Sequence, residues 1–131
     1  MRILSITAQK PHSTGSGVYL TETVRGFKEL GHTQAVIAGV TREDSVKLPE
    51  GVGFYPVYYN SPELPFLVCG MSDEMPYEST RYRYMKPDMV DKFEAAFGSA
   101  VLRAVKEFRP DVVICHHLYL LAAIVREKLP D

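Results

Sequence analysis

Hydrophobic positions recur along the chain in two alternating patterns. Short continuous apolar runs predict strands, and longer stripes with an apolar residue at every third or fourth position predict helices. The predicted strands cover residues 2–8, 34–38, 54–59 and 111–115, and the predicted helices cover residues 18–30, 88–109 and 118–128. Strands that alternate with helices predict an α/β class: a single Rossmann-like three-layer domain over residues 1–131, with a mainly parallel sheet.

The last predicted strand differs from the others in its composition. Residues 111–115 end in the continuous apolar run Val112 to Cys115. Pro110 stands just before this strand and must end the preceding helix. A continuous apolar run is typical of a central parallel strand that is covered on both faces. We therefore expect this strand to lie in the middle of the sheet.

Residues 60–87 show no clean periodicity. They contain four prolines, at positions 62, 65, 76 and 87. A segment of this length inside a compact domain is usually functional or disordered. Its charged residues, Arg81 among them, suit either phosphate or carboxylate binding or a solvated loop.

Two loops leave predicted strands at their carboxyl ends, where open parallel sheets bind ligands. One is Gln9 to Gly17, and the other begins with His116 and His117. The fold is expected to bring them to one edge although about a hundred residues separate them in the sequence.

The first loop contains Gly15, Ser16 and Gly17 directly before a predicted helix. Glycines allow a close approach of backbone to ligand, and the free N–H groups of a helix start attract anions. Leu20 stands where a dinucleotide-binding motif has its third glycine, and no Gly-Lys-Ser/Thr follows, so neither that motif nor a P-loop is present. A plain tight turn with a serine cap explains the pattern equally well.

The two histidines occupy successive positions of an extended segment, so their side chains point opposite ways. One is expected to face the cleft while the other packs or caps. Without a spaced third ligand, the pair does not predict a metal site. A purely structural role for each histidine stays open.

Composition narrows the choice of partners. The 131 residues fit one domain, and the formal net charge of -1 argues against binding nucleic acid through its phosphates. Lys92, Arg103 and other charges of both signs on the helix 88–109 are typical of a solvated face. The longest apolar stretch, residues 118–125, is far too short to span a bilayer, and Cys69 and Cys115 fit free thiols in a reducing compartment. We expect a cytoplasmic protein, either free or peripheral to a membrane.

Several motifs together resemble one known family. The opening residues 1–4, the turn at residues 15–17 and the helix ending in Gly31-His32 are similar to the start of a GT-B fold glycosyltransferase of the retaining GT4 type. The segment 108–119 resembles that family's Pro-Asp-Val-Val…His-His stretch, and residues 75–82 resemble a loop of one subgroup. The turn departs from the family in its central serine, and Ile114 replaces the first histidine of a common His-x-His pattern.

The resemblance implies that the chain is the N-terminal, acceptor-side half of such an enzyme. The turn at Gly15, Ser16 and Gly17 would bind the donor diphosphate beside the acceptor, and His116 would be the catalytic histidine near the transferred sugar. Acceptor binding would fall to His117 and to the loop at Ser79, Thr80 and Arg81. The donor would be a UDP- or GDP-sugar, and neither a cofactor nor a metal is expected.

The family's nucleotide-binding C-terminal domain lies outside these residues, so the chain is expected to be inactive alone and that domain to be its partner. A cleft face left uncovered would expose apolar and aromatic side chains, for instance between Pro65 and Tyr84, and drive weak self-association. Two alternatives stay open. One is a stand-alone flavodoxin-like binding or partner module without catalysis. The other is a nucleotide-dependent oxidoreductase, against which the absent third glycine and the lack of an acidic residue after residue 38 both count.

Overall fold

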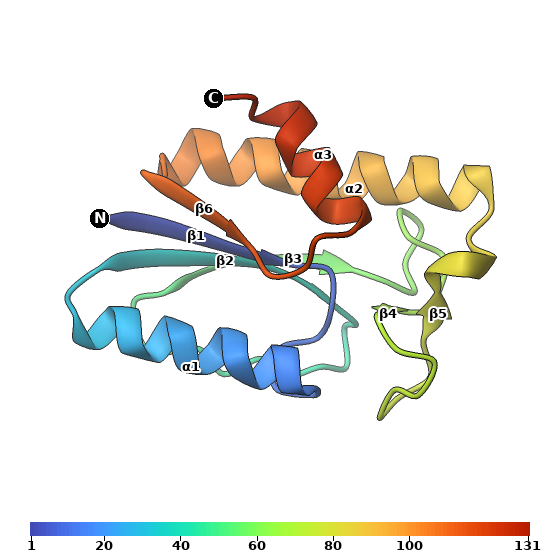
Figure 1. Ribbon diagram of the computed structural model, residues 1–131, viewed down its shortest axis with the longest axis horizontal. Helices are drawn as coiled ribbons and strands as arrows, with labels where there is room; N and C mark the ends of the chain where they lie inside the picture. The colour runs from blue at the N-terminus through green and yellow to red at the C-terminus, as the bar shows by residue number, and fades with distance from the viewer.

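The computed structural model describes residues 1–131 without interruption and has three layers (Figure 1). Its central sheet is all parallel, with the strand order β3-β2-β1-β6. The strands are β1 (Arg2–Thr7), β2 (Thr33–Val40), β3 (Gly53–Tyr58) and β6 (Val112–Cys115). Helix α1 (Gly15–Glu29) covers one face of the sheet, and α2 (Pro87–Phe108) and α3 (Leu120–Lys128) cover the other (Figure 1). The predicted Rossmann-like α/β fold is confirmed.

Alternation along β2 divides the core into two parts. Val36, Ala38 and Val40 pack with α1, whereas Ala35 and Ile37 belong to the larger cluster beneath α2 and α3. That larger cluster is built on aromatic rings of α2, because Phe93 and Phe97 are fully buried with their ring centroids 4.5 Å apart. A sheet packed on both faces gives the loops at its ends a rigid base.

Helix α1 begins three residues earlier than its apolar stripe predicts. Thr14 has the extended backbone of an N-cap, and its hydroxyl accepts a hydrogen bond from the N–H of Gly17 at 3.1 Å. This cap stabilises a first turn made of Gly15, Ser16 and Gly17 despite their poor helix propensity. The expected glycine turn before the helix is therefore the first turn of the helix itself.

Strand β6 is an edge strand, and the expectation of a central position is wrong. It pairs only with β1, and its residues are exposed or half-buried. Val112 is 38% exposed although it belongs to a continuous apolar run. An apolar run shows that a strand prefers to be covered, but it does not show that a neighbouring strand is present.

Residues 59–86 follow β3 and are held mainly by local bonds. They contain a two-stranded parallel pair, β4 (Cys69–Gly70) and β5 (Thr80–Arg81), and one turn of 3-10 helix, η1 (Tyr82–Tyr84). The segment is anchored to the core by Tyr59, whose buried hydroxyl donates to the carbonyl of Ala8 at 3.0 Å, and by buried Leu64 and Val68. Helix α3 begins at Leu120, two residues later than expected, since Leu118 lies outside the core at 95% exposure.

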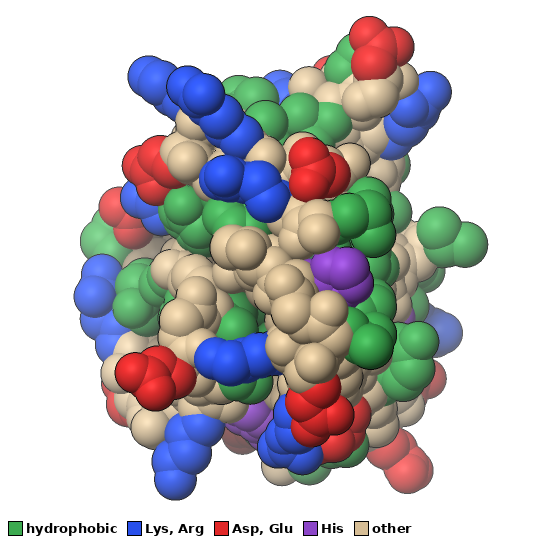
Figure 2. Space-filling view, turned by 90° about the vertical axis from the view of Figure 1, so that its left-hand side faces the viewer, with side chains coloured by type: hydrophobic (Ala, Val, Ile, Leu, Met, Phe, Trp, Pro, Cys, Tyr) green, Lys and Arg blue, Asp and Glu red, His purple; other side chains and the backbone are tan.

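The two ends of the sheet differ in character. At the amino ends of the strands, basic and acidic side chains are interspersed over the surface (Figure 2). There the N-terminal ammonium group bonds Nδ1 of His32 at 3.0 Å. The predicted site residues in the loops after β1 and β6 lie at the opposite end of the sheet, where the strands have their carboxyl ends.

Candidate functional site

The candidate site lies at the carboxyl ends of β1 and β6. These strands are neighbours in the sheet, with Ile6 opposite Cys115, so the loops that follow them leave side by side. The N–H of His116 donates to the carbonyl of Ile6 at 3.0 Å and continues the strand pairing by one residue. The structure therefore brings the glycine turn and the histidine pair to one edge.

The first turn of α1 presents two free backbone donors. Gly17 donates to Thr14 and Val18 closes the first helical bond to the same residue, whereas the N–H groups of Gly15 and Ser16 have no partner in the protein. Unpaired donors at a helix N-terminus carry the positive end of the helix dipole. This turn is suited to an anionic ligand.

A cavity of about 320 Å³ adjoins this turn. One wall consists of Gly15 and Ser16 with Thr14 and Gln9, and the other comes from the segment between β4 and β5. The second wall is formed by Met71, Ser72, Glu74, Met75 and Pro76. A ligand bound here would contact backbone donors, hydroxyl groups and one carboxylate.

Gln9 is a site residue that the sequence reasoning missed. Its side chain is almost fully buried at 2% exposure, and its Oε1 lies 3.3 Å from the hydroxyl of Ser16 and 3.5 Å from that of Thr14. Its Nε2 is buried without a hydrogen-bond partner. An unsatisfied buried donor is costly unless a ligand or water completes it. The signal was a polar residue directly after a buried strand.

Gly17 serves a different purpose from Gly15. A Cβ at residue 17 would lie 2.8 Å from the carbonyl oxygen of Lys10 and 2.9 Å from the N of His12, both backbone atoms, whereas a Cβ at residue 15 meets nothing within 4 Å. Gly17 is buried and does not line the cavity. It lets the loop after β1 pack against the helix.

His116 is half-buried next to α1. Its ring meets the ring of Tyr19 edge-on, with centroids 6.1 Å apart, and its Nε2 is buried without a partner. Burial, and then the neighbouring His117, lower the pKa of His116 below its ordinary value. The imidazole is therefore neutral at neutral pH, with both a donor and an acceptor nitrogen.

His117 is similar in chemistry but lies where the chain leaves the sheet. Burial lowers its pKa too, and its Nε2 also has no partner. The residues around the pair are exposed and apolar: Leu118 is 95% exposed, Tyr19 67% and Tyr119 49%. This apolar group, Tyr19, Leu118 and Tyr119, borders the site on the side of β6.

Ser79, Thr80 and Arg81 do not line the cavity at Gly15. The hydroxyl of Thr80 donates to the carbonyl of Leu67 at 2.6 Å. The guanidinium of Arg81 donates to the backbone carbonyl of Asp73 at 3.1 Å, and its Nε lies 3.7 Å from the Asp73 carboxylate. Ser79 packs against Gly70 in the β4–β5 pair. These three residues hold the segment whose neighbouring residues, Met71 to Pro76, form the cavity wall.

A second polar cluster lies in the loop after β1. Lys10 forms an ion pair with Asp44 at 2.9 Å and lies 4.9 Å from the ring centre of Tyr77. Burial by itself raises the pKa of Asp44, but hydrogen bonds from the backbone and hydroxyl of Thr41 and from Lys10 outweigh it and lower that pKa. The cluster ties the loops after β1 and β2 to residues 60–87.

No group of three His, Cys, Asp or Glu side chains is arranged to hold a metal ion. None of the helices combines the length and the apolar composition needed to cross a membrane.

No family model matches the sequence, and no curated protein matches it. Fold and site together define the class of the protein as a Rossmann-like α/β domain with an anion-suited helix start at the carboxyl edge of its sheet.

Proposed function

We propose that this chain is the N-terminal, acceptor-side half of a retaining glycosyltransferase of GT-B type, which moves a sugar from a UDP- or GDP-sugar to an acceptor. The observation that carries the proposal is the meeting of two features at one edge: the free N–H groups of Gly15 and Ser16 and the neutral imidazole of His116 beside α1. The sequence motifs described above supply the choice of reaction.

In this proposal the helix start binds the diphosphate of the donor. Departure of the sugar leaves negative charge on that diphosphate, and backbone donors already aimed at it lower the barrier without reorganising. The buried amide of Gln9 holds the hydroxyl of Ser16 in place at 3.3 Å. Ser16 thus orients the turn while its own N–H remains available to the phosphate.

His116 acts on the transferred sugar. A neutral imidazole donates one hydrogen bond and accepts another, so it positions sugar hydroxyl groups without adding charge next to a positively charged sugar-like transition state. The lowered pKa keeps His116 in this form. Acceptor binding is assigned to the wall from Met71 to Pro76, to Ser79, Thr80 and Arg81, which hold that wall, and to His117 after β6.

The proposal makes the chain one wall of a two-sided cleft. The half-exposed apolar strand β6 and the exposed group Tyr19, Leu118 and Tyr119 are surfaces that further protein would cover. Closure of both sides is needed to exclude water from the reacting groups. The partner is the nucleotide-binding C-terminal domain of the same enzyme, and the chain is inactive without it.

Calorimetry of the chain with UDP, GDP and their sugars tests this proposal. The expected result is weak, millimolar binding with no turnover, since only the diphosphate contacts are present. Micromolar binding or turnover by the chain alone would contradict its role as an incomplete half. Complete absence of binding even to pyrophosphate would favour a binding module without catalysis.

A further inference from the structure

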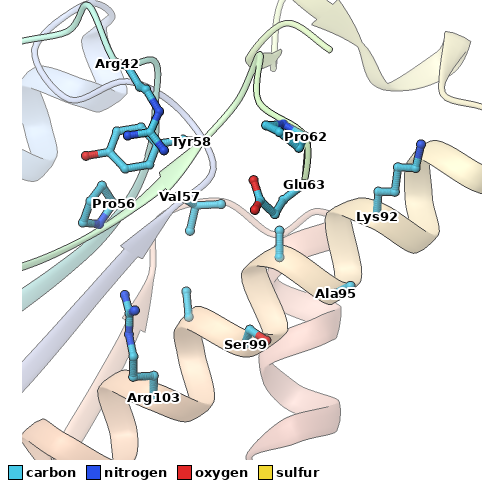
Figure 3. A pocket seen from close by; sticks show the side chains of 12 residues that line it. Arg42, Pro56, Val57, Tyr58, Pro62, Glu63, Lys92, Ala95, Ser99 and Arg103 are labelled. Atoms are coloured by element: carbon cyan, nitrogen blue, oxygen red, sulfur yellow. The ribbon is translucent and has the colours of Figure 1, made fainter. Parts of the chain in front are cut away.

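A second cavity lies away from the candidate site, between β3 and α2 (Figure 3). Its volume is about 870 Å³, within the range of about 300–1,000 Å³ that small-molecule sites occupy. None of its lining residues lines the cavity at Gly15 and Ser16. It is therefore a separate feature, on the outer edge of the sheet.

Three cationic side chains line this groove: Arg42 after β2, and Lys92 and Arg103 from α2. The lining contains one carboxylate, Glu63, so three positive charges and one negative charge give a formal net charge of +2. None of the three cations forms an ion pair, because the ion pairs of the protein join other residues. An excess of cations over carboxylates in the lining is suited to an anion.

The two arginines are held in place by aromatic rings. The guanidinium of Arg42 lies 4.4 Å from the ring centre of Tyr58, and that of Arg103 lies 5.5 Å from the ring centre of Tyr55. Both are at the same end of the groove, with Pro56 of β3 between them (Figure 3). Stacked guanidinium groups keep their donors in a fixed plane, as bidentate binding of phosphate requires.

The rest of the groove fits an uncharged, hydroxyl-bearing body. Its floor on α2 consists of small residues, Ala95, Ala96, Ser99 and Ala100, which leave room next to the strand. The carboxylate of Glu63 projects over this floor (Figure 3). A carboxylate only accepts hydrogen bonds, so it binds hydroxyl groups and repels a second phosphate. Lys92 lies at the other end of the groove (Figure 3).

We infer that this groove binds a phosphate monoester that also carries hydroxyl groups, with the phosphate at the end of the groove that Arg42 and Arg103 line and the hydroxyls at Glu63 and Ser99. The same chemistry is offered by a free sugar or polyol phosphate and by a phospholipid headgroup. The inference does not depend on the proposed transferase activity, since the two sites share no residue.

Calorimetry with glucose 6-phosphate, with glucose as the unphosphorylated control, tests the site. Saturable binding is expected for the phosphate ester alone. Arg42→Gln and Arg103→Gln should each weaken it about tenfold, as loss of a charge-assisted hydrogen bond does. Lys106→Gln is the matched control, because Lys106 is exposed on the same helix but outside the groove, and it should leave binding unchanged. All three positions are exposed, so the variants are expected to fold.

Glu63→Ala separates the two ends of the groove. It should weaken glucose 6-phosphate relative to inorganic phosphate, because only the sugar uses the carboxylate. Sedimentation with phosphatidylcholine vesicles, with and without phosphatidic acid, distinguishes the sources: binding to phosphatidic acid vesicles that Arg103→Gln removes identifies a lipid headgroup. The inference would be overturned if neither glucose 6-phosphate nor phosphatidic acid vesicles bind. It would also be overturned if Arg42→Gln and Arg103→Gln leave the binding unchanged.

Discussion

At the scale of single residues, His116 and Gln9 distinguish this sheet edge from a plain turn. Both bury a polar nitrogen without a partner in the protein, and both lie next to the N-terminal part of α1, Gln9 at Ser16 and His116 at Tyr19. Neither arrangement adds to stability, because an unsatisfied buried donor or acceptor costs free energy. Such a cost is typical of positions that a ligand completes.

The lowered pKa of the two histidines predicts a pH-dependent stability. Below about pH 6.5 the unfolded chain takes up protons at His116 and His117 that the folded chain does not accept, so the free energy of unfolding falls as the pH falls. Urea denaturation at pH 7.5 and pH 5.5 measures this change. The double variant His116→Gln/His117→Gln should lose less stability between the two pH values than the wild type.

His32→Gln is the control for this experiment, since His32 lies at the opposite end of the sheet, bonded to the N-terminus. It leaves His116 and His117 in place, so the loss of stability that these two residues cause at low pH should remain. If the double variant loses as much stability as the wild type, the histidines are not held neutral by the fold, and the role assigned to His116 loses its electrostatic basis.

At the scale of elements, the loop after β1 depends on the close approach of Gly17. Gly17→Ala should destabilise the fold by about 1–3 kcal/mol, because its Cβ would collide with two backbone atoms that have little room to move. Gly26→Ala in the same helix is the matched control. Its Cβ meets nothing within 4 Å, so it should stabilise by about 0.5–1 kcal/mol through the helix propensity of alanine. Equal effects of the two substitutions in denaturant melts would show that the loop does not pack on Gly17.

The sequence predicts most elements because periodicity reflects which face of each element is covered. It places strands and helices within a few residues, but it misses the start of α1, since the cap at Thr14 outweighs the low helix propensity of the residues after it. It also misplaces β6 at the centre of the sheet. Composition records a preference for burial, whereas an edge position depends on which neighbours the strand has.

The candidate site is predictable in part. Gly15 and His116 follow from the rule that loops meet at the carboxyl ends of parallel strands, and the structure places both there. Gln9 was detectable as a polar residue directly after a buried strand. The groove at β3 was not, because Arg42 and Arg103 are far apart in the sequence and their meeting depends on packing. The one sequence signal was the helical spacing of Lys92, Ser99 and Arg103, which puts these polar residues on the same face of α2.

At the scale of the whole molecule, several large apolar side chains near the site and in residues 65–84 are exposed. They include Tyr19, Leu118 and Tyr119, and within the segment expected to be exposed they include Leu67, Met71 and Tyr84. Exposed apolar side chains promote association. The chain should therefore form a weak dimer at high concentration in sedimentation velocity, and Leu118→Ser should shift it toward monomer. A strict monomer, or a dimer that this variant does not change, would contradict the prediction.

The central claim is that this edge is one wall of a nucleotide-sugar site. An NMR titration of the isotope-labelled chain with UDP- and GDP-sugars tests it most directly, because it reports where a weak ligand binds. We expect fast-exchange chemical-shift changes at the amides of Gly15 and Ser16 and at the His116 ring, with little change at Arg42 and Arg103 and a dissociation constant in the millimolar range. Shifts confined to other parts of the molecule, or tight saturable binding, would contradict it.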